Sequence, residues 1–431
     1  MKTTILLLLL SLSSLSLRTA SGADEGSRLS LVEVTRAVLA YNPYIEEARQ
    51  KWEAANKRIV QETAWDDLKV SANTVTARFV NIAPNAFTDQ SLSVEQAIPM
   101  SGKNRSRARI AAAEAVAAFE QMRRQQLDTL AQARASYFRL ADVYAQLELN
   151  RRNYESVAQI AKINRAGYEA GRQSVADVLE SETEATKLLE SERDLEGRLT
   201  EAQSQLNVLM NRDAFAALGV PDTPTMSKLP YALDALRTTT LANRPELQSA
   251  KANVEAEKAK LQLAHRAWIP DPAIGLHGER YNDTGQALSQ IGVGLSFSVP
   301  WGNQRKYSAG VSEAKANLVA AEAALERVEK EAIGRLRIAL QAVETAHHHV
   351  EFCRDRLVPA AHQVFQATQF AYESGKAPFA DWIAAQQRER DLEAEALEHL
   401  AHHQIALAEL EAVVGADLNV FPAAGMTADH K

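Results

Sequence analysis

A strict alternation of apolar and small residues runs through the stretch SQIGVGLSFSVPWGNQRK, from Ser289 to Lys306. Every second residue from Ile291 to Val299 is apolar. A period of two places these side chains on one face of a β-strand. Similar segments, paired across turn-forming residues, predict two β-hairpins at about 68–99 and about 272–300. Strands of roughly ten residues have the length that crosses a bilayer.

The segments between the hairpins carry apolar residues at spacings of three and four instead. The first half has seams over 130–154 and 188–209, and the second half has seams over 333–357 and 396–414. Such sustained seams are typical of coiled coils. A helix over 307–372 would be about 100 Å long at 1.5 Å per residue, which indicates a rod rather than a compact domain.

The chain is a duplicate. GYEAGRQSVADV at 167–178 recurs as AYESGKAPFADW at 371–382, and NPYIEEA at 42–48 is echoed by RPELQSA at 244–250. An offset that stays near 200 residues indicates two structural repeats. The predicted divisions are a signal peptide (1–23), a first repeat (24–211), a linker or equatorial segment (212–232), a second repeat (233–416) and a C-terminal tail (417–431).

The first residues carry the pattern of a secretory signal. Lys2 precedes an apolar run from Ile5 to Leu17, and the small residues Ser21 and Ala23 end it. A membrane anchor is the less favoured alternative, because about 20 apolar residues are needed to span a bilayer. With Cys353 as its single cysteine, the chain forms no internal disulfide, and its formal net charge of −7 argues against nucleic acid as a partner.

Four strands cannot close a barrel, and an open sheet edge is not tolerated in lipid. Either the hairpins lie outside a membrane or several copies complete the wall. Three copies would supply twelve strands, an even number that barrels use.

Three motifs resemble the TolC-type outer-membrane factors, the exit ducts of tripartite efflux pumps and type I secretion systems. They are SLVEVTRAVLAYNP at 30–43, IPMSGKNRSRARIAAAEA at 98–115 and the twice-used Y-E-x-G-[RK]-x3-A-D. The resemblance is greatest to the branch that serves heavy-metal and cation efflux pumps. One departure follows the strand-end proline, where Ser101-Gly102 and Gly302-Asn303 replace a frequent Gly pair, so the conformation of that turn stays open.

The resemblance implies a mainly α protein with a β-barrel part. Long coiled-coil hairpins would form an α-barrel, and each protomer of a homotrimer would add four transmembrane strands. The expected location is the outer membrane, with a helical tunnel in the periplasm. Its expected partners are a periplasmic adaptor, an inner-membrane transporter and outer-membrane lipid.

The sequence carries no G-x-S-x-G elbow, Walker A loop, H-E-x-x-H or C-x-x-C motif. We therefore expect neither catalysis nor a cofactor.

The repeated turns are candidate adaptor-binding tips, because loop tips on rigid scaffolds commonly bind partners. Their glycines are predicted to take the left-handed conformation that ends a helix. The alternative is that these are only tight helix turns. The candidate residues are Tyr168, Gly171, Val175, Asp177, Tyr372, Gly375, Phe379 and Asp381.

Three acids near the turns, Asp177, Glu180 and Asp381, are candidates for the tunnel entrance. In a trimer each lumen-facing acid becomes a ring of three, and charged rings select ions by sign. An equally supported alternative is that Asp177 and Asp381 stabilise helix N-termini.

Seven of the ten histidines lie between residues 347 and 403. His347, His399 and His403 fall at a similar height on antiparallel rods, where three imidazoles could bind a transition metal. The better supported alternative is that polar residues in a coiled-coil seam set its register.

The sequence thus predicts a passive outer-membrane exit duct of a tripartite efflux pump, and the resemblance favours a pump of the metal-cation type. A type I secretion channel, a periplasmic coiled-coil adaptor or scaffold, and a histidine-site metalloenzyme or metal chaperone are the alternatives.

Overall fold

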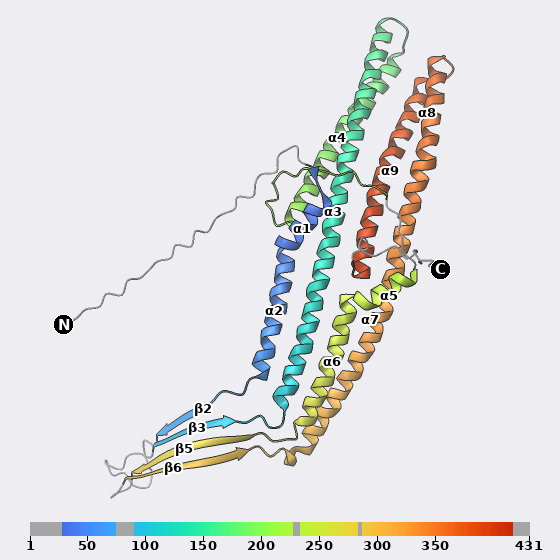
Figure 1. Cartoon of the computed structure of the whole chain (residues 1–431). Coiled ribbons are helices and arrows are strands. Elements are labelled where there is room, and N and C mark those ends of the chain that lie inside the picture. Colours follow the sequence, from blue (N-terminus) through green and yellow to red (C-terminus); the bar gives the residue numbers. More distant parts are fainter. Residues whose placement is uncertain (1–27, 75–89, 227–232, 283–286, 417–431) are drawn as a thin grey trace, which may run out of the picture.

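The computed structural model describes residues 28–74, 90–226, 233–282 and 287–416, and all structural statements refer to these. They form an elongated molecule in which helical rods run lengthwise and a small sheet lies at one end (Figure 1). None of the helices in these ranges has the length and apolar character needed to cross a membrane.

The two repeats supply similar sets of elements. The first contains β1 (Arg28–Leu29), α1 (Leu31–Tyr41), α2 (Pro43–Thr63), β2 (Lys69–Thr74), β3 (Gln90–Ala97), α3 (Lys103–Glu169) and α4 (Val175–Leu209). After β4 (Val220–Pro221), the second contains α5 (Leu233–Asn243), α6 (Pro245–Arg266), β5 (Pro272–Asn282), β6 (Ala287–Phe297), a 3₁₀ turn (Trp301–Asn303), α7 (Gln304–Phe352), a π-helical turn (Cys353–Leu357), α8 (Val358–Glu373) and α9 (Phe379–Val414).

The alternating segments form a four-stranded antiparallel sheet in the order β2-β3-β5-β6. One row across it consists of Val70, Val94, Leu276 and Val293, which are paired in register. This face is open: Val293 is 77% exposed. The predicted strands and their apolar face are confirmed, whereas the pairing of β3 with β5, which joins the two repeats, was not predicted.

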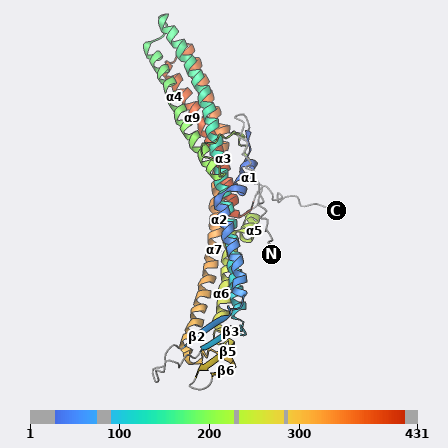
Figure 2. The same ribbon diagram turned by 90° about the vertical axis from the view of Figure 1, so that its left-hand side faces the viewer.

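The rods form two sections along the molecule (Figures 1 and 2). Next to the sheet, α2, α3, α6 and α7 lie side by side, with contacts between each neighbouring pair. At the far end are two helical hairpins, α3–α4 and α8–α9, and α3 packs against α9 to join them. A short parallel pairing of β1 with β4 lies near the middle.

Equivalent joints hold the short helices of the two repeats. Asn42 caps α2 by accepting from the N–H of Tyr44 (2.9 Å), and its amide donates to the carbonyl of Leu209 (2.8 Å). Arg244 precedes α6 and donates from Nη1 to the carbonyl of Val413 (3.4 Å). Leu209 and Val413 are 204 positions apart, so the repeats place different side chains in the same joint.

The two turns that leave the sheet differ in conformation, which settles the turn that the sequence left open. Gly102 has φ +71, and a Cβ there would lie 2.0 Å from Nη1 of Arg266. In the second repeat a 3₁₀ turn occupies this place, and Asn303 has φ −110. Asp271 braces the first turn by accepting from the N–H (2.7 Å) and hydroxyl (2.8 Å) of Ser101.

The prediction of one uninterrupted α-helix over 307–372 is wrong in one respect. Between α7 and α8 the helix has a π-helical turn at Cys353–Leu357. Pro359, in the first turn of α8, has no N–H for the carbonyl four residues earlier, so the hydrogen-bond ladder shifts. The predicted signal peptide, C-terminal tail and part of the linker (227–232) lie outside the described residues.

Candidate channel entrance at the hairpin tips

The two hairpin tips have the same backbone geometry. Gly171 and Gly375 have φ of +70 and +69, which confirms the predicted left-handed glycines. The N–H of Arg172 donates to the carbonyl of Gly167 (2.7 Å), and the N–H of Lys376 donates to that of Ala371 (2.8 Å). This 6→1 bond with a left-handed glycine is the Schellman ending of a helix. A Cβ on either tip glycine would meet no atom within 4 Å, so both glycines face open space.

At the first tip a capping box starts the returning helix. The N–H of Asp177 donates to the hydroxyl of Ser174 (3.1 Å), and the Asp177 carboxylate accepts from the N–H of Ser174 (3.3 Å). Such reciprocal bonds satisfy two backbone donors that a helix start leaves free. The local role of Asp177 is therefore that of a helix cap, which is the alternative that the sequence left open.

At the second tip Pro378 occupies the cap position and makes no side-chain hydrogen bond. Asp381 lies in the first turn of α9 and is exposed, and Glu180 near the first tip is exposed as well. Two of the three candidate entrance acids are thus open to solvent.

An aromatic cluster fills the second tip. Tyr372 stacks on Trp382 with ring centroids 5.2 Å apart, and Phe379 packs edge-on against both rings. Ile160 of α3 packs against the cluster, so it joins the two hairpins. Phe379 is 2% exposed, so it presents no surface to an adaptor in this conformation, contrary to the prediction. Trp382 was missed although it follows the repeated Ala-Asp.

Tyr372 also links the tips directly. Its hydroxyl accepts a hydrogen bond from the amide of Gln173 (3.0 Å) in the first turn. Burial raises the pKa of Tyr372. Of the predicted tip residues, Tyr168 and Val175 keep about half of their surface exposed, at 49% and 48%. These two, with the tip glycines and Asp381, are the exposed members of the predicted set, whereas Asp177 and Tyr372 are half-buried.

A buried ion pair connects the hairpins farther from the tips. Glu184 of α4 is 2% exposed and accepts from Arg390 (2.8 Å) and from the amide of Gln387 (2.6 Å), both on α9. Burial opposes the charge of Glu184, but these donors prevail and lower its pKa. The sequence analysis missed this pair, although Glu184 stands four residues before the seam residue Leu188 and so shares its face.

The structure does not gather the three candidate metal ligands. His347 lies against His403 with ring centroids 5.4 Å apart, whereas His399 lies against His349 at 5.1 Å. In the described ranges no group of three or more His, Cys, Asp or Glu side chains is arranged to hold a metal ion. The predicted alignment of His347 with His403 on antiparallel helices is confirmed. The predicted three-histidine metal site is wrong, because His399 pairs with a different histidine, His349.

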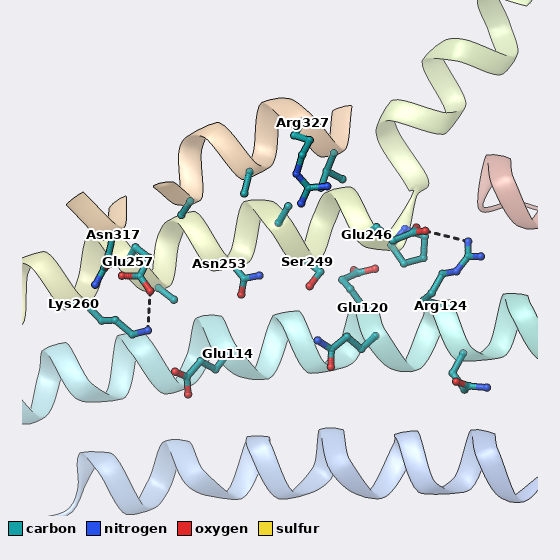
Figure 3. A pocket seen from close by; sticks show the side chains of 18 residues that line it. Glu114, Glu120, Arg124, Glu246, Ser249, Asn253, Glu257, Lys260, Asn317 and Arg327 are labelled. Carbon is teal, nitrogen blue, oxygen red and sulfur yellow. Dashed lines mark hydrogen bonds and ion pairs between the residues drawn. The ribbon is translucent and has the colours of Figure 1, made fainter. Parts of the chain in front are cut away.

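A groove of about 800 Å³ runs between α3, α6 and α7 (Figure 3). Its acids have basic neighbours: Glu246 lies 3.2 Å from Arg124, and Glu257 lies 2.8 Å from Lys260. The lining mixes carboxylates, cations and amides with small apolar residues, and it shows no arrangement of groups for catalysis.

Comparison with known proteins fits this architecture. The chain is similar to the cobalt-zinc-cadmium resistance protein CzcC of Cupriavidus metallidurans, with 24% identity over 237 residues. That match covers 52% of this chain and 54% of CzcC, so the chain spans about half the length of that curated relative.

Solved structures share the fold over most of the chain. The outer-membrane channel OprN gives a TM-score of 0.76 at 17% identity and covers 90% of both chains. CusC, whose structures concern folding and transmembrane channel formation, gives 0.77 at 15% identity and covers 93% of this chain and 96% of its own. At these identities the likeness establishes the fold.

The sequence profile described as outer membrane efflux protein matches residues 34–212 and 236–416, one segment for each repeat. These two segments include all of the long helices and the four strands of the sheet. The chain belongs to the outer membrane efflux protein family.

Proposed function

We propose that this protein is the passive exit duct of a tripartite efflux pump, which conducts substrate delivered by an inner-membrane transporter. The observation that carries the proposal is the open sheet with an exposed apolar face, continuous with rods too long for a compact domain. The two outer strands of this sheet, β2 and β6, are its edges. In lipid such edges must be paired, and three copies would close a twelve-stranded barrel.

The same arrangement would make the rods a tunnel in the periplasm, with the hairpin tips at its entrance. There the exposed tip residues would meet a periplasmic adaptor. The duct itself would perform no catalysis and need no cofactor, because the transporter supplies the energy. A type I secretion channel would share this architecture, so the transported substrate distinguishes an efflux duct from a secretion channel.

Metal cations are the cargo that we favour. The relative CzcC is named for resistance to cobalt, zinc and cadmium. Asp381 and Glu180, exposed near the tips, would give a trimer two rings of negative charge at the entrance. Such rings attract cations and repel anions.

Single-channel recording in planar lipid bilayers tests the proposal. The wild-type protein should give discrete conductance steps. Val293→Asp places a charge on the apolar face, which is unfavourable in the middle of a bilayer and should abolish insertion. The matched variant Ser296→Asp lies on the same strand but on the opposite face and should still conduct. Loss of conductance in both variants, or in neither, would contradict a membrane position for this sheet.

A further inference from the structure

The seam between α7 and α9 contains a histidine pair between layers of apolar residues. Val343 and Leu336 of α7 pack against Leu410 and Ala406 of α9. One turn farther toward the tip, His347 faces His403 across the same seam, with ring centroids 5.4 Å apart. Val350, 4% exposed, continues the seam beyond this layer. The two imidazoles are therefore part of the helix contact itself.

His403 is the more enclosed of the pair. It is 1% exposed, and its Nδ1 is buried without a hydrogen-bond partner among the described residues. His347 is one-quarter exposed, and its Nε2 lies 3.3 Å from a carboxylate oxygen of Glu351. A proton on His347 would thus have a counter-charge and access to water, whereas a proton on His403 would have neither.

The charged groups around this layer do not compensate a proton on His403. The charge that acts on His403 is that of His347, from α7. On its own helix, His399 is paired with Glu395 (3.3 Å) and His402 with Glu398 (3.8 Å). From α3, Asp142 acts on His402 and Glu398. Burial lowers the pKa of His403, and the neighbouring His347 lowers it further.

We propose that the His347–His403 layer makes the contact between α7 and α9 sensitive to protonation, so that this contact loosens when the solution becomes acidic. A histidine in an open chain takes up a proton near pH 6.5. Because folded His403 resists that proton, the open state binds more protons below this pH. The stability that neutral His403 gives is fully present above about pH 6.5 and is lost as the pH falls below it. The inference concerns the folded protomer and does not depend on the proposed export function.

Hydrogen–deuterium exchange of the full chain in detergent tests the proposal, with rates corrected for the intrinsic effect of pH. Peptides from 336–352 and 400–414 should lose protection several-fold between pH 7.5 and pH 5.5. His403→Gln, which does not titrate, should remove most of this loss. The control His402→Gln changes a histidine that is 59% exposed on the same helix and should keep the wild-type response.

A second variant and the sign of the Asp142 titration distinguish the role of His403 from other causes of acid sensitivity. Should His403→Gln fail to fold, His347→Gln removes the charge that opposes protonation of His403 and should give a smaller acid response. Asp142 has a pKa raised by burial, so its titration stabilises the fold at low pH and cannot imitate the predicted loss. The proposal is overturned by unchanged protection of the wild type at pH 5.5, or by an equal loss in His403→Gln.

Discussion

The carboxylate of Glu184 accepts a hydrogen bond from the guanidinium of Arg390 at 2.8 Å, and this ion pair joins helix α4 of one hairpin to helix α9 of the other. Glu184 is 2% exposed, and the side chain of Arg390 is 20% exposed. A charge removed from water in this way is stable only while its partner is present. The pair therefore ties the two hairpins of one protomer together.

Glu184→Gln should destabilise the protein measurably. The variant keeps the size of the side chain but leaves Arg390 with only the exposed carboxylate of Asp391, at 3.7 Å, which we expect to cost about 2 kcal/mol. The midpoint of thermal unfolding in detergent measures this. The control Glu196→Gln breaks a pair on the same helix with Arg193, whose side chain is 79% exposed, and should cost less than about 0.5 kcal/mol. Equal unfolding midpoints for the two variants would show that the buried pair does not stabilise the contact between the hairpins.

Gly102→Ala should be costly and Gly302→Ala should not. Gly102 has φ +71 and a Cβ there would displace the guanidinium of Arg266, whereas Gly302 has open space around it. A left-handed conformation alone costs an L-residue about 1–2 kcal/mol. Thermal unfolding of the two variants should differ by at least this amount. A similar small effect at both glycines would mean that the two turns are interchangeable.

Valine at either tip glycine should weaken adaptor docking while assembly persists. A β-branched residue resists a positive φ, so Gly171→Val should distort the turn that presents Tyr168 and Val175, and Gly375→Val should distort the turn that precedes Asp381. Crosslinking to the adaptor should fall in both variants. Gly197→Val lies within α4, where nothing stands within 4 Å of the new Cβ, and serves as the control. Adaptor crosslinking at the control level in both tip variants would count against the tips as the docking surface.

Asp381→Asn should weaken block of the channel by a trivalent cation. In a trimer this substitution removes three exposed charges from the entrance, and we expect block to weaken about tenfold, or about 1.4 kcal/mol. Asp177→Asn should change block less, because the Asp177 carboxylate is bonded to the N–H of Ser174 in the capping box, and asparagine keeps an oxygen that can accept this bond. Equal block in the parent and in Asp381→Asn would contradict a role of Asp381 at the entrance.

The sequence predicted the parts of the fold that repeat or alternate. The alternation from Ile291 to Val299 identified a strand face, and the recurrence of Y-E-x-G identified two turns of the same geometry. Both signals are local, because strand pleat and helix endings depend on nearby residues. The pairing of β3 with β5 depends on how the two repeats dock, which no local pattern encodes.

The candidate site was less predictable, because its contacts also depend on how the two repeats pack together. Asp177 could be assigned as a cap or as an entrance acid, and only its bonds with Ser174 separate the two roles locally. Tyr372 and Phe379 looked like surface residues of a turn, but the neighbouring hairpin and Trp382 enclose them. His399 lies against His349 and does not join His347 and His403. The direction of a side chain, as well as its height along the helix, decides which residues meet.

The mass of the full-length protein in detergent tests the central claim most directly. The open sheet edges and the apolar row through Leu276 and Val293 require partners, so the protein should require detergent and should contain three chains in each particle. Light scattering corrected for bound detergent, or native mass spectrometry, counts the chains. A particle of three chains agrees with the exit duct, whereas a stable monomer that is soluble in water without detergent would contradict it.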